Sequence, residues 1–390
     1  MLHRLLDIFH SFLQIAFRII FARKAQVLFY YPQHFNRSAA GTNPFFDPLL
    51  QTCEEAGISY KLLEEPDWGT DKPRNPRAIK ADAFFVLVLI LRKLVKLAGI
   101  KDFYAAEPHV ARLVNVLTFG RLRYRRYVTI SGSMQFLFAA MNEDTRVYDM
   151  QHGNLYKQHY VFFGNNRKLR KPYYNRKLKW LVWGKGYRDC FCQGEEELLA
   201  DRVFVVGYPI HSEKNIFKSR DNVLLLSLQL TADYNQQELI EEKKLLEGLL
   251  EQLQGSNYKV LLKHHPRYND IISVDDWSEK YDNIEFSTSP LDELVAEVKF
   301  HITCWSTTAF EYAKYGIPTY FLYNDIRPMG KRLFYEEYKY PLYYKMHIND
   351  VLERISDDSK YAQDASCVQE WYQTFYSTYD SEVFKRLLID

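Results

Sequence analysis

The segment "HITCWSTTAFEYAKYGIP", His301 to Pro318, decides the fold class of this chain. Its apolar start predicts a strand over Phe300–Thr303, and a turn rich in Ser and Thr then opens a predicted helix over Thr307–Tyr315. A further strand is predicted over Thr319–Tyr323. Strand, helix and strand in succession are typical of α/β proteins with parallel sheets.

The same alternation extends along the rest of the chain. The second half begins with a predicted strand over Val223–Leu228, a helix over Gln237–Leu253, and strands over Lys259–Lys263 and Asn283–Phe286. The first half contains a similar series, in which helices separate the strands. Its predicted strands are Gln26–Tyr31, Tyr60–Leu63, Tyr127–Ser131, Val147–Met150, Lys179–Trp183 and Val203–Val206.

Two such series predict two domains, because 390 residues exceed what a single core usually organises. We expect an α/β architecture, in which two doubly wound, Rossmann-like domains face a central cleft. The predicted division is an amphipathic N-terminal helix over 1–24, a first domain over 25–208, a linker over 209–221, a second domain over 222–356 and a helical tail over 357–390.

Charge and cysteine content narrow the function classes. The 51 basic and 49 acidic residues leave a net charge of +2, which excludes a dedicated nucleic-acid binder. The five cysteines are scattered without a CxxC pair, as expected for free thiols in a reducing cytoplasm. The apolar N-terminus carries charges and lacks a small-residue cleavage site, so it does not read as a secretory signal.

The N-terminal segment 1–24 has an amphipathic pattern with two interpretations. Apolar residues at 5, 8, 9, 12, 13, 16, 19 and 20 form one helical stripe, with polar side chains opposite. The helix either docks on the body of the protein or lies on a membrane surface. The basic aromatic run Arg167–Trp180 is either a solvated loop or a second membrane contact. The apolar run Ala83–Leu91 is too short to span a bilayer and predicts a buried helix.

Polar side chains follow several predicted strands, where parallel sheets bind ligands. Ser306, Thr307 and Thr308 open a helix whose free N–H groups favour a phosphate. In "LLKHHPR" a strand runs into His265 and a proline that fixes the turn. Candidates for further contacts with the donor nucleotide or its ribose are Glu311, Ser227, Gln229, Lys263 and Arg267.

In the stretch "VYDMQHGNLY" of the first domain, His152 follows the end of a predicted strand. A neutral imidazole at His152 is suited to take a proton from an acceptor hydroxyl near neutral pH. Gln151 and His34 are candidates for acceptor contacts. If His152 is not the base, His34 and Asp149 are next.

These residues resemble motifs of bacterial GT-B glycosyltransferases of surface-polysaccharide assembly. "KHHPR" is similar to their HP motif, and "CWSTTAFEYAKYGIP" resembles the Ser/Thr-rich turn of capsule-synthesis transferases, including Kdo transferases, and of CDP-glycerol glycerophosphotransferases. "SLQ" is similar to a strand end of the capsule group, and "QHG" resembles the HG motif of the glycerophosphotransferases. The resemblance covers about residues 127–322.

The resemblance implies roles for individual residues. His265, Ser306, Thr307 and Thr308 would bind donor phosphate in the second, donor domain, while the first domain would bind the acceptor. The DDG or EDG motif of the sialyltransferases that share the HP motif is missing from the sequence, which leaves His152 as the preferred base. No DxD motif occurs at a predicted strand end, so we expect neither a cofactor nor an essential divalent metal.

We therefore predict a glycosyltransferase that moves a sugar from a CMP-, CDP-, UDP- or GDP-linked donor to a surface-polysaccharide or lipid-linked glycan acceptor. The expected location is the cytoplasm or the inner face of the plasma membrane, with no nucleic-acid partner. Three alternatives stay open. They are a CDP-polyol phosphotransferase, an enzyme like the UDP-sugar 2-epimerases, and a nucleotide-sugar-binding protein without catalysis.

Overall fold

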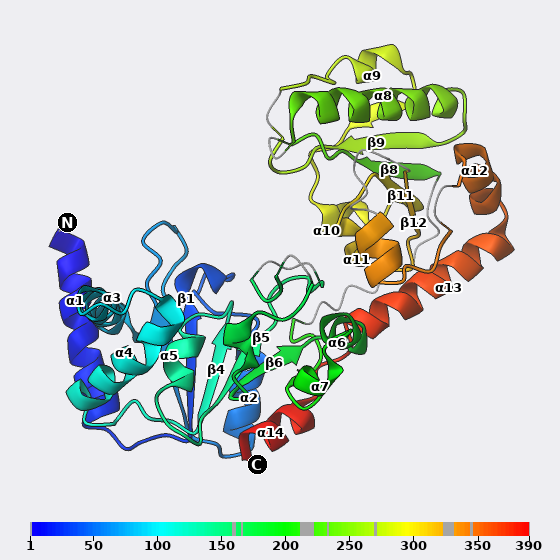
Figure 1. Ribbon diagram of the computed structural model, residues 1–390. Helices are drawn as coiled ribbons and strands as arrows, with labels where there is room; N and C mark the ends of the chain where they lie inside the picture. Colours follow the sequence, from blue (N-terminus) through cyan, green and yellow to red (C-terminus); the bar gives the residue numbers. More distant parts are fainter. Residues whose placement is uncertain are drawn as a thin grey trace. The chain divides into compact units, whose positions relative to one another are not determined.

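The computed structural model describes residues 2–157, 161–164, 167–210, 222–231, 234–268, 271–322, 331–343 and 346–389. The chain forms two compact units (Figure 1). Unit 1 comprises Met1–His211 and Tyr376–Asp390, and unit 2 comprises Ser212–Phe375.

Unit 1 is built on a seven-stranded parallel sheet with the order β3-β2-β1-β4-β5-β6-β7. The order reverses between β1 and β4, as in doubly wound folds. The register pairs Tyr30 of β1 with Thr129 of β4, and Thr129 with Asp149 of β5. The strands are β1 Val27–Pro32, β2 Tyr60–Glu65, β3 Ile79–Lys80, β4 Arg126–Ile130, β5 Arg146–Met150, β6 Leu178–Val182 and β7 Val203–Val205.

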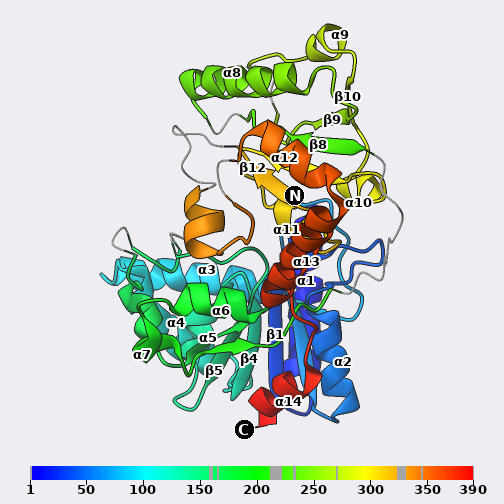
Figure 2. The same cartoon turned by 90° about the vertical axis from the view of Figure 1, so that its right-hand side faces the viewer.

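Helices cover both faces of this sheet. Figures 1 and 2 show α3, α4 and α5 on one side and α2 and α14 on the other. The helices of unit 1 are α1 Leu2–Ile15, η1 Ala16–Ile20, η2 Gln33–Phe35, α2 Asp47–Glu55, α3 Asp82–Leu97, α4 Phe103–Leu117, α5 Gln135–Ala139, η3 Lys171–Tyr174, α6 Lys185–Cys192, α7 Glu196–Leu199 and α14 Ser381–Ile389.

The C-terminal segment of the chain returns to complete unit 1. Tyr208, which follows β7, pairs with Thr378 in an isolated parallel bridge, and the Ser377 amide donates to the Trp183 carbonyl after β6. Gly207 permits this contact, because a Cβ there would lie 2.1 Å from the Thr378 carbonyl oxygen, and its φ of +83° favours glycine. At the other end of the segment, the Tyr148 hydroxyl donates to the Leu387 carbonyl at 2.8 Å.

Unit 2 contains a five-stranded parallel sheet with the order β10-β9-β8-β11-β12. Its strands are β8 Val223–Ser227, β9 Lys259–Lys263, β10 Ile284–Phe286, β11 Phe300–Thr303 and β12 Thr319–Phe321. Its helices are α8 Gln236–Leu253, α9 Trp277–Lys280, α10 Leu291–Leu294, α11 Thr308–Ala313, η4 Lys331–Glu337, α12 Ile348–Ser356 and α13 Asp358–Phe375.

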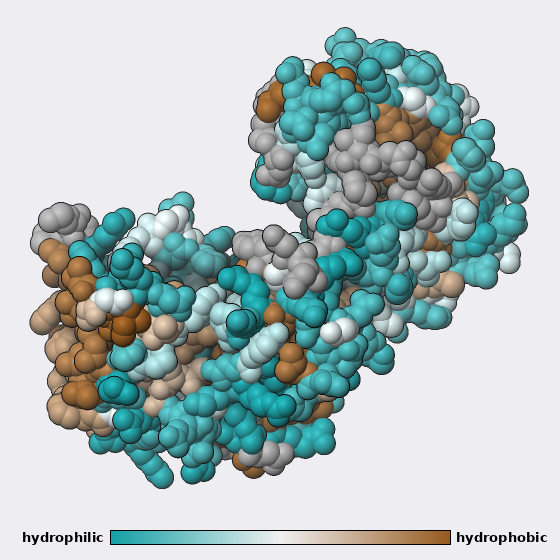
Figure 3. Space-filling model, viewed as in Figure 1, coloured by the Kyte–Doolittle hydropathy of each residue, from teal (hydrophilic) through white to brown (hydrophobic). Residues whose placement is uncertain are grey.

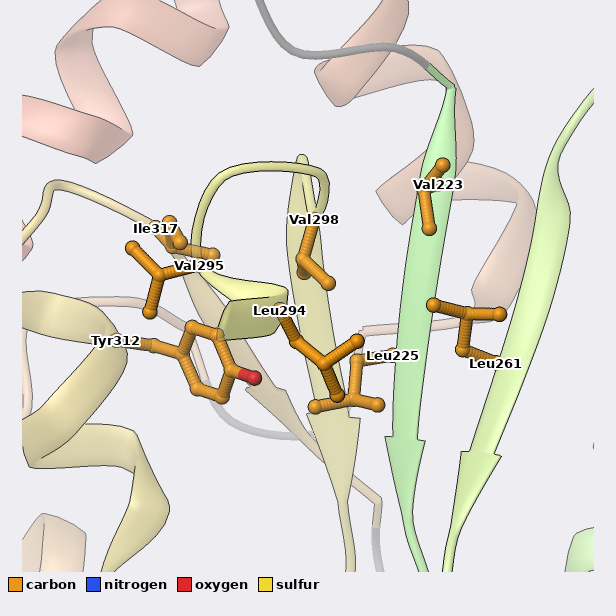
Figure 4. Close-up of a cluster of buried hydrophobic side chains, with 8 residues drawn as sticks. All are labelled: Val223, Leu225, Leu261, Leu294, Val295, Val298, Tyr312 and Ile317. Carbon is orange, nitrogen blue, oxygen red and sulfur yellow. The ribbon is translucent and has the colours of Figure 1, made fainter. Parts of the chain in front are cut away.

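The core of unit 2 follows from the alternation of side chains along its strands. Val223 and Leu225 of β8 point to one face, where they meet side chains from α10, α11 and the adjoining loops (Figure 4). The cluster also contains Leu261, Leu294, Val295, Val298, Tyr312 and Ile317, all less than a tenth exposed. An Asn235–Glu238 capping box begins α8.

The prediction of two doubly wound α/β units is confirmed by the two sheets. The sequence analysis missed the two-residue strand β3, and its linker over 209–221 lies mostly outside the described residues. The tail placed over 357–390 is divided, since α13 belongs to unit 2 and α14 to unit 1. The run Ala83–Leu91 does lie in a helix, but Leu89 and Ile90 are 43% and 51% exposed, so its prediction as fully buried is wrong.

Candidate functional site

The predicted donor residues follow the carboxyl ends of the unit 2 strands. Strand order reverses between β8 and β11, where Ser227 pairs with Thr303. Chain segments leave such a switch point toward opposite faces of the sheet, which opens a crevice for ligands. Gln229 follows β8, Ser306 follows β11, and His265 follows the neighbouring strand β9. The topology therefore brings these three positions to one edge.

His265 is held in an orientation suited to a phosphate donor. The Arg267 backbone amide donates to its Nδ1 at 3.1 Å. A neutral imidazole with Nδ1 as acceptor carries its proton on Nε2, which can then donate a hydrogen bond. The preceding residue, His264, stacks on Tyr268 and Phe286 with ring centroids 3.8 and 4.9 Å apart. Of the two adjacent histidines, His264 packs among aromatic rings and His265 is the candidate for ligand contact.

The hydroxyl turn after β11 is ordered by its own hydrogen bonds. The Ser306 hydroxyl donates to the Thr308 hydroxyl at 2.8 Å and accepts from the Thr308 amide at 3.2 Å. Both residues are buried, whereas Thr307 is exposed. Thr307 therefore presents its hydroxyl at the surface, and Ser306 and Thr308 shape the turn behind it.

Three further candidates are bonded within unit 2. The Ser227 hydroxyl contacts Nε2 of the buried His301 at 2.9 Å. The Lys263 ammonium donates to the Ser289 carbonyl at 2.5 Å. The backbone N–H of Gln229 donates to the Glu242 carboxylate at 3.2 Å. Ser227 and Lys263 thus stabilise the carboxyl edge of the sheet. Because their side chains already bond to the protein, they position the site and are less accessible to a ligand than His265.

The remaining two donor candidates, Glu311 and Arg267, have exposed side chains. The pKa of the Glu311 carboxyl is raised, first because the carboxyl group is partly shielded from water and second because Asp292 is negatively charged. A carboxylate at this position can accept hydrogen bonds from sugar hydroxyls.

Unit 1 contains its own cavity of about 520 Å³ at the carboxyl ends of β2, β4, β5 and β6. Its walls include side chains of α3 and α4 and the turn that bears His152. It is lined by Glu65, Phe85, Arg92, Phe103, Glu107, Ser131, Gly132, Ser133, Met134, Gln135, Phe136, Asp149, Met150, Gln151, His152, Gly153, Asn154, Leu155, Val161, Phe162, Tyr173, Trp180, Leu181 and Val182.

Two carboxyl groups of this cavity have raised pKa values. Burial raises the pKa of Asp149 to about 6, although its Oδ1 accepts hydrogen bonds from the Thr129 hydroxyl and the Gly132 amide at 3.0 and 2.9 Å. Burial also raises the pKa of Glu65, which accepts a 2.5 Å hydrogen bond from Ser133. Perturbed carboxyl groups in a cavity are typical of functional sites.

His152 lies at the rim of this cavity. Its side chain is exposed, and its ring meets Phe35 edge-on with centroids 5.3 Å apart. On the same phenyl ring, His34 lies at 4.6 Å, and its Nδ1 contacts Asp67 at 2.8 Å. The structure therefore brings together the preferred base and the second acceptor candidate around Phe35.

The neighbours of His152 hold the turn in different ways. The Gln151 side chain accepts from the Trp183 amide at 2.9 Å and donates to the Gly153 carbonyl at 2.8 Å, so it supports the turn from inside. A Cβ on Gly153 would meet no atom within 4 Å. The local backbone thus does not require glycine at this position, and the open space beside it is available to a ligand.

The sequence analysis missed several groups of the cavity. Arg92 forms a two-point ion pair with the buried Glu107, at 2.7 and 3.0 Å, and lies over Phe103. Ser131 and Met134 have positive φ values of 64° and 54°, which are strained for residues other than glycine. The stretch "SGSM" directly after a predicted strand was the available signal for this turn.

The second half of the chain matches a known family. Residues 220–389 match the model described as CDP-Glycerol:Poly(glycerophosphate) glycerophosphotransferase. The second half of the chain is therefore similar to this family of transferases. The matched residues include both His265 and the hydroxyl turn. No curated protein is significantly similar to the chain in sequence.

Solved structures show that the chain has a GT-B fold. It is similar to a variant of the wall teichoic acid polymerase TagF, with 15% identity, a TM-score of 0.50, and coverage of 100% of this chain and 96% of the other. It is similar to UDP-GlcNAc 2-epimerase from Neisseria meningitidis, with 10% identity, a TM-score of 0.51, and 93% and 99% coverage. The third is the lipopolysaccharide outer core galactosyltransferase WaaB, with 11% identity, a TM-score of 0.50, and 93% and 98% coverage.

Proposed function

We propose that this transferase moves a glycerophosphoryl or related polyol-phosphoryl group from a CDP-linked donor to a hydroxyl group of a cell-surface polymer. The family match over residues 220–389 carries the proposal, because these residues include His265 and the Ser306–Thr308 turn at the switch point of unit 2. Transfer of a glycosyl group from a nucleotide-sugar is the second candidate, favoured by the resemblance to the capsule-synthesis transferases.

In this proposal unit 2 binds the donor diphosphate. Nε2–H of His265 and the hydroxyl turn hydrogen-bond its phosphate oxygens, and such charge-assisted bonds are strong. The acceptor oxygen attacks the phosphorus that bears the glycerol. A new P–O bond forms, the bond to the CMP oxygen breaks, and CMP leaves with the electron pair. For the second candidate the same oxygen attacks the anomeric carbon and the nucleotide leaves.

We assign the acceptor to unit 1 and the proton to His152. The acceptor hydroxyl enters beside Gly153, where space is open, and Nε2 or Nδ1 of the neutral imidazole takes its proton as the new bond forms. The cavity with Glu65, Asp149 and the Arg92–Glu107 pair binds the polar part of the acceptor. We expect no essential divalent ion, because hydrogen-bond donors at the sheet edge can stabilise the leaving phosphate. We place the reaction in the cytoplasm or at the inner face of the membrane.

A donor panel tests this function. Thermal shifts with CMP, CDP, UDP and GDP identify the nucleotide, and product release from CDP-glycerol and from the matching nucleotide-sugars identifies the transferred group. Cytidine nucleotides should give the largest shift, and CMP should be released from CDP-glycerol only when a polymer acceptor is present. Interconversion of a UDP-sugar without any acceptor would instead establish the epimerase, and nucleotide binding without turnover of any donor would establish a binding protein.

The two histidines should separate binding from turnover. His265→Ala should weaken nucleotide binding by about 10- to 100-fold, because it removes a bond to a charged phosphate. His152→Ala should reduce turnover by about 10²- to 10⁴-fold and leave nucleotide affinity unchanged, because a general base contacts the acceptor. Calorimetric titration and initial rates measure both. Exchanged effects would reverse the two roles, and normal turnover of His152→Ala would transfer the base to Asp149 or His34.

A further inference from the structure

The N-terminal helix α1 packs on the protein through a mixed face, in which the polar Ser11 and Gln14 lie beside the buried Ile15. The buried Ser11 hydroxyl donates to the Lys80 carbonyl at 2.7 Å and accepts from the Ala83 amide at 3.0 Å. On the same face Gln14 accepts from the Lys80 amide at 2.9 Å, and Asp7 pairs with the Lys80 ammonium at 3.0 Å. An amphipathic helix on a water-soluble surface normally turns its large apolar side chains toward the core.

The apolar face of this helix is consequently turned outward. From α1 into the following residues, its large side chains are between 37% and 74% exposed. They are Leu5, Leu6, Phe9, Phe12, Leu13, Phe17 and Phe21. Polar contacts and the buried Ile15 and Ile19 hold the inner face, so the segment is docked on the protein while its large Leu and Phe side chains remain exposed. The two interpretations of segment 1–24 are therefore compatible.

Helices α3 and α4 extend the same surface. α1 packs against α3, and α3 packs against α4. Figure 3 shows the hydrophobic surface gathered over these helices of unit 1. Their exposed apolar side chains are Leu89, Ile90, Leu94, Leu97, Leu113, Val116, Leu117 and Phe119. We call these residues, with the seven of the α1 face, the apolar platform. Contiguous apolar patches of this kind mark interaction sites.

The segments that carry the platform are strongly basic. Residues 2–24 and 82–125 contain 12 Lys and Arg against 4 Asp and Glu, a net of +8, whereas the whole chain has +2. The four acidic side chains are engaged. Asp7 pairs with Lys80, Asp82 with Arg74 and Glu107 with Arg92, and Asp102 caps α4. The net positive charge of these segments is therefore carried by basic side chains that the four acidic groups do not neutralise.

Basic side chains gather beside the loop that follows α4. Burial lowers the pKa of Lys24, and the positive charges of Arg121 and Arg123 lower it further. Phe119 lies in the same loop, is 82% exposed and has a strained φ of +52°. Lys24, Arg121 and Arg123 repel one another, and a nearby anion would stabilise them. Beside the exposed Phe119 ring, such an anion would lie at the boundary between water and an apolar phase.

We propose that the apolar platform lies on an anionic lipid bilayer, with its aromatic and aliphatic side chains in the headgroup region and its basic residues against lipid phosphates. Among the residues that the structure describes, no helix is long and apolar enough to cross a bilayer, which agrees with a contact confined to one leaflet. Arg4 lies 5.6 Å from the ring centroid of Trp68, which is 45% exposed, and Trp is typical of the membrane interface.

Charge favours lipid over a second copy of the chain. A twofold dimer through this face would bring the same surface of each copy together. In each copy the segments that form this face have a net charge of +8, and like charges across an interface are unfavourable. An anionic bilayer instead attracts each basic residue near its surface.

Vesicle co-sedimentation of the full chain tests the proposal. We expect binding to vesicles that contain phosphatidylglycerol, weaker binding to phosphatidylcholine alone, and release by salt. Phe12→Gln with Phe17→Gln should lower the partition about a hundredfold, or about tenfold for each lost ring. The matched control is Ile271→Gln with Ile389→Gln, two side chains of similar exposure outside the platform, which should bind like wild type.

Two further measurements separate the outcomes. Arg121→Gln with Arg123→Gln should reduce binding to anionic vesicles and leave binding to neutral vesicles unchanged. Circular dichroism melting of each variant should match wild type, since the substituted side chains are exposed. The proposal is overturned if wild type does not bind anionic vesicles, or if the control pair loses binding equally. It is also overturned if sedimentation velocity finds a dimer that the two Phe substitutions dissociate, because the platform is then a protein interface.

Discussion

The substitution Asp149→Asn should stabilise unit 1 in a pH-dependent way. Asp149 lies at the end of β5, where burial raises its pKa from 3.8 to about 6. The folded state therefore holds this proton more strongly than the unfolded state. The stability contributed by the protonated carboxyl is fully present below pH 3.8 and is lost as pH rises through 6. Asparagine keeps the oxygen that accepts from Thr129 and Gly132, and it stays neutral at every pH.

The size of the effect follows from the two pKa values. A difference of about two units, at about 1.4 kcal/mol each, corresponds to about 3 kcal/mol at pH 8 and to about half of that at pH 5. Any constant cost of placing the asparagine NH₂ group in the cavity is the same at both pH values. The change in stability between pH 5 and pH 8 therefore isolates the titration of Asp149.

Urea denaturation followed by circular dichroism between pH 5 and pH 8 measures this difference. Asp71→Asn is the control, because Asp71 is an exposed aspartate of the same unit. Asp149→Asn should gain stability relative to wild type as pH rises, and Asp71→Asn should not. A gain that is independent of pH, or a loss that grows toward pH 8, would show that the buried carboxyl is ionised without penalty and refute the reasoning.

Further substitutions test other parts of the structure. Gly207→Ala should destabilise unit 1 by about 3 kcal/mol, because the new methyl group meets the Thr378 carbonyl and φ is positive. Thermal melting measures this loss of stability, and an unchanged melting temperature would contradict the close approach. Gly153→Ala should melt like wild type, since its Cβ meets nothing, yet should slow turnover if the acceptor passes there; unchanged rates would remove Gly153 from the acceptor path. Turnover should persist in a metal chelator, and a loss that Mg²⁺ or Mn²⁺ restores would reverse the expectation of metal-independent transfer.

The fold could be predicted from the sequence because each strand carries a strong local signal. Strands β9 Lys259–Lys263 and β11 Phe300–Thr303 have the predicted bounds, since short apolar runs end at punctuating residues. The two-residue strand β3 carries no such pattern. Its pairing depends on the neighbouring strand β2, which is tertiary information.

The candidate site was predicted in part for the same reason. His152, His265 and the Ser306–Thr308 turn follow recognisable strand ends, so their positions could be inferred from sequence order. The partner of the Ser227 hydroxyl could not, because His301 reaches it across the sheet. The role of Arg167–Trp180 also depends on packing, since Tyr173 and Trp180 are buried while Arg167, Lys168 and Arg170 are exposed, and its membrane contact stays a prediction.

The return of the chain to unit 1 has a consequence for biosynthesis. Residues 376–390, which pair with Tyr208 and carry α14, are translated only after all of residues 212–375 have been made. Until then the Tyr208 amide lacks its acceptor, the Ser377 carbonyl, and the Tyr148 hydroxyl lacks the carbonyl of Leu387. Unit 1 is thus begun first and completed last. A nascent chain interrupted within unit 2 leaves these polar groups without their partners, and such an incomplete unit is a target for chaperones and proteases.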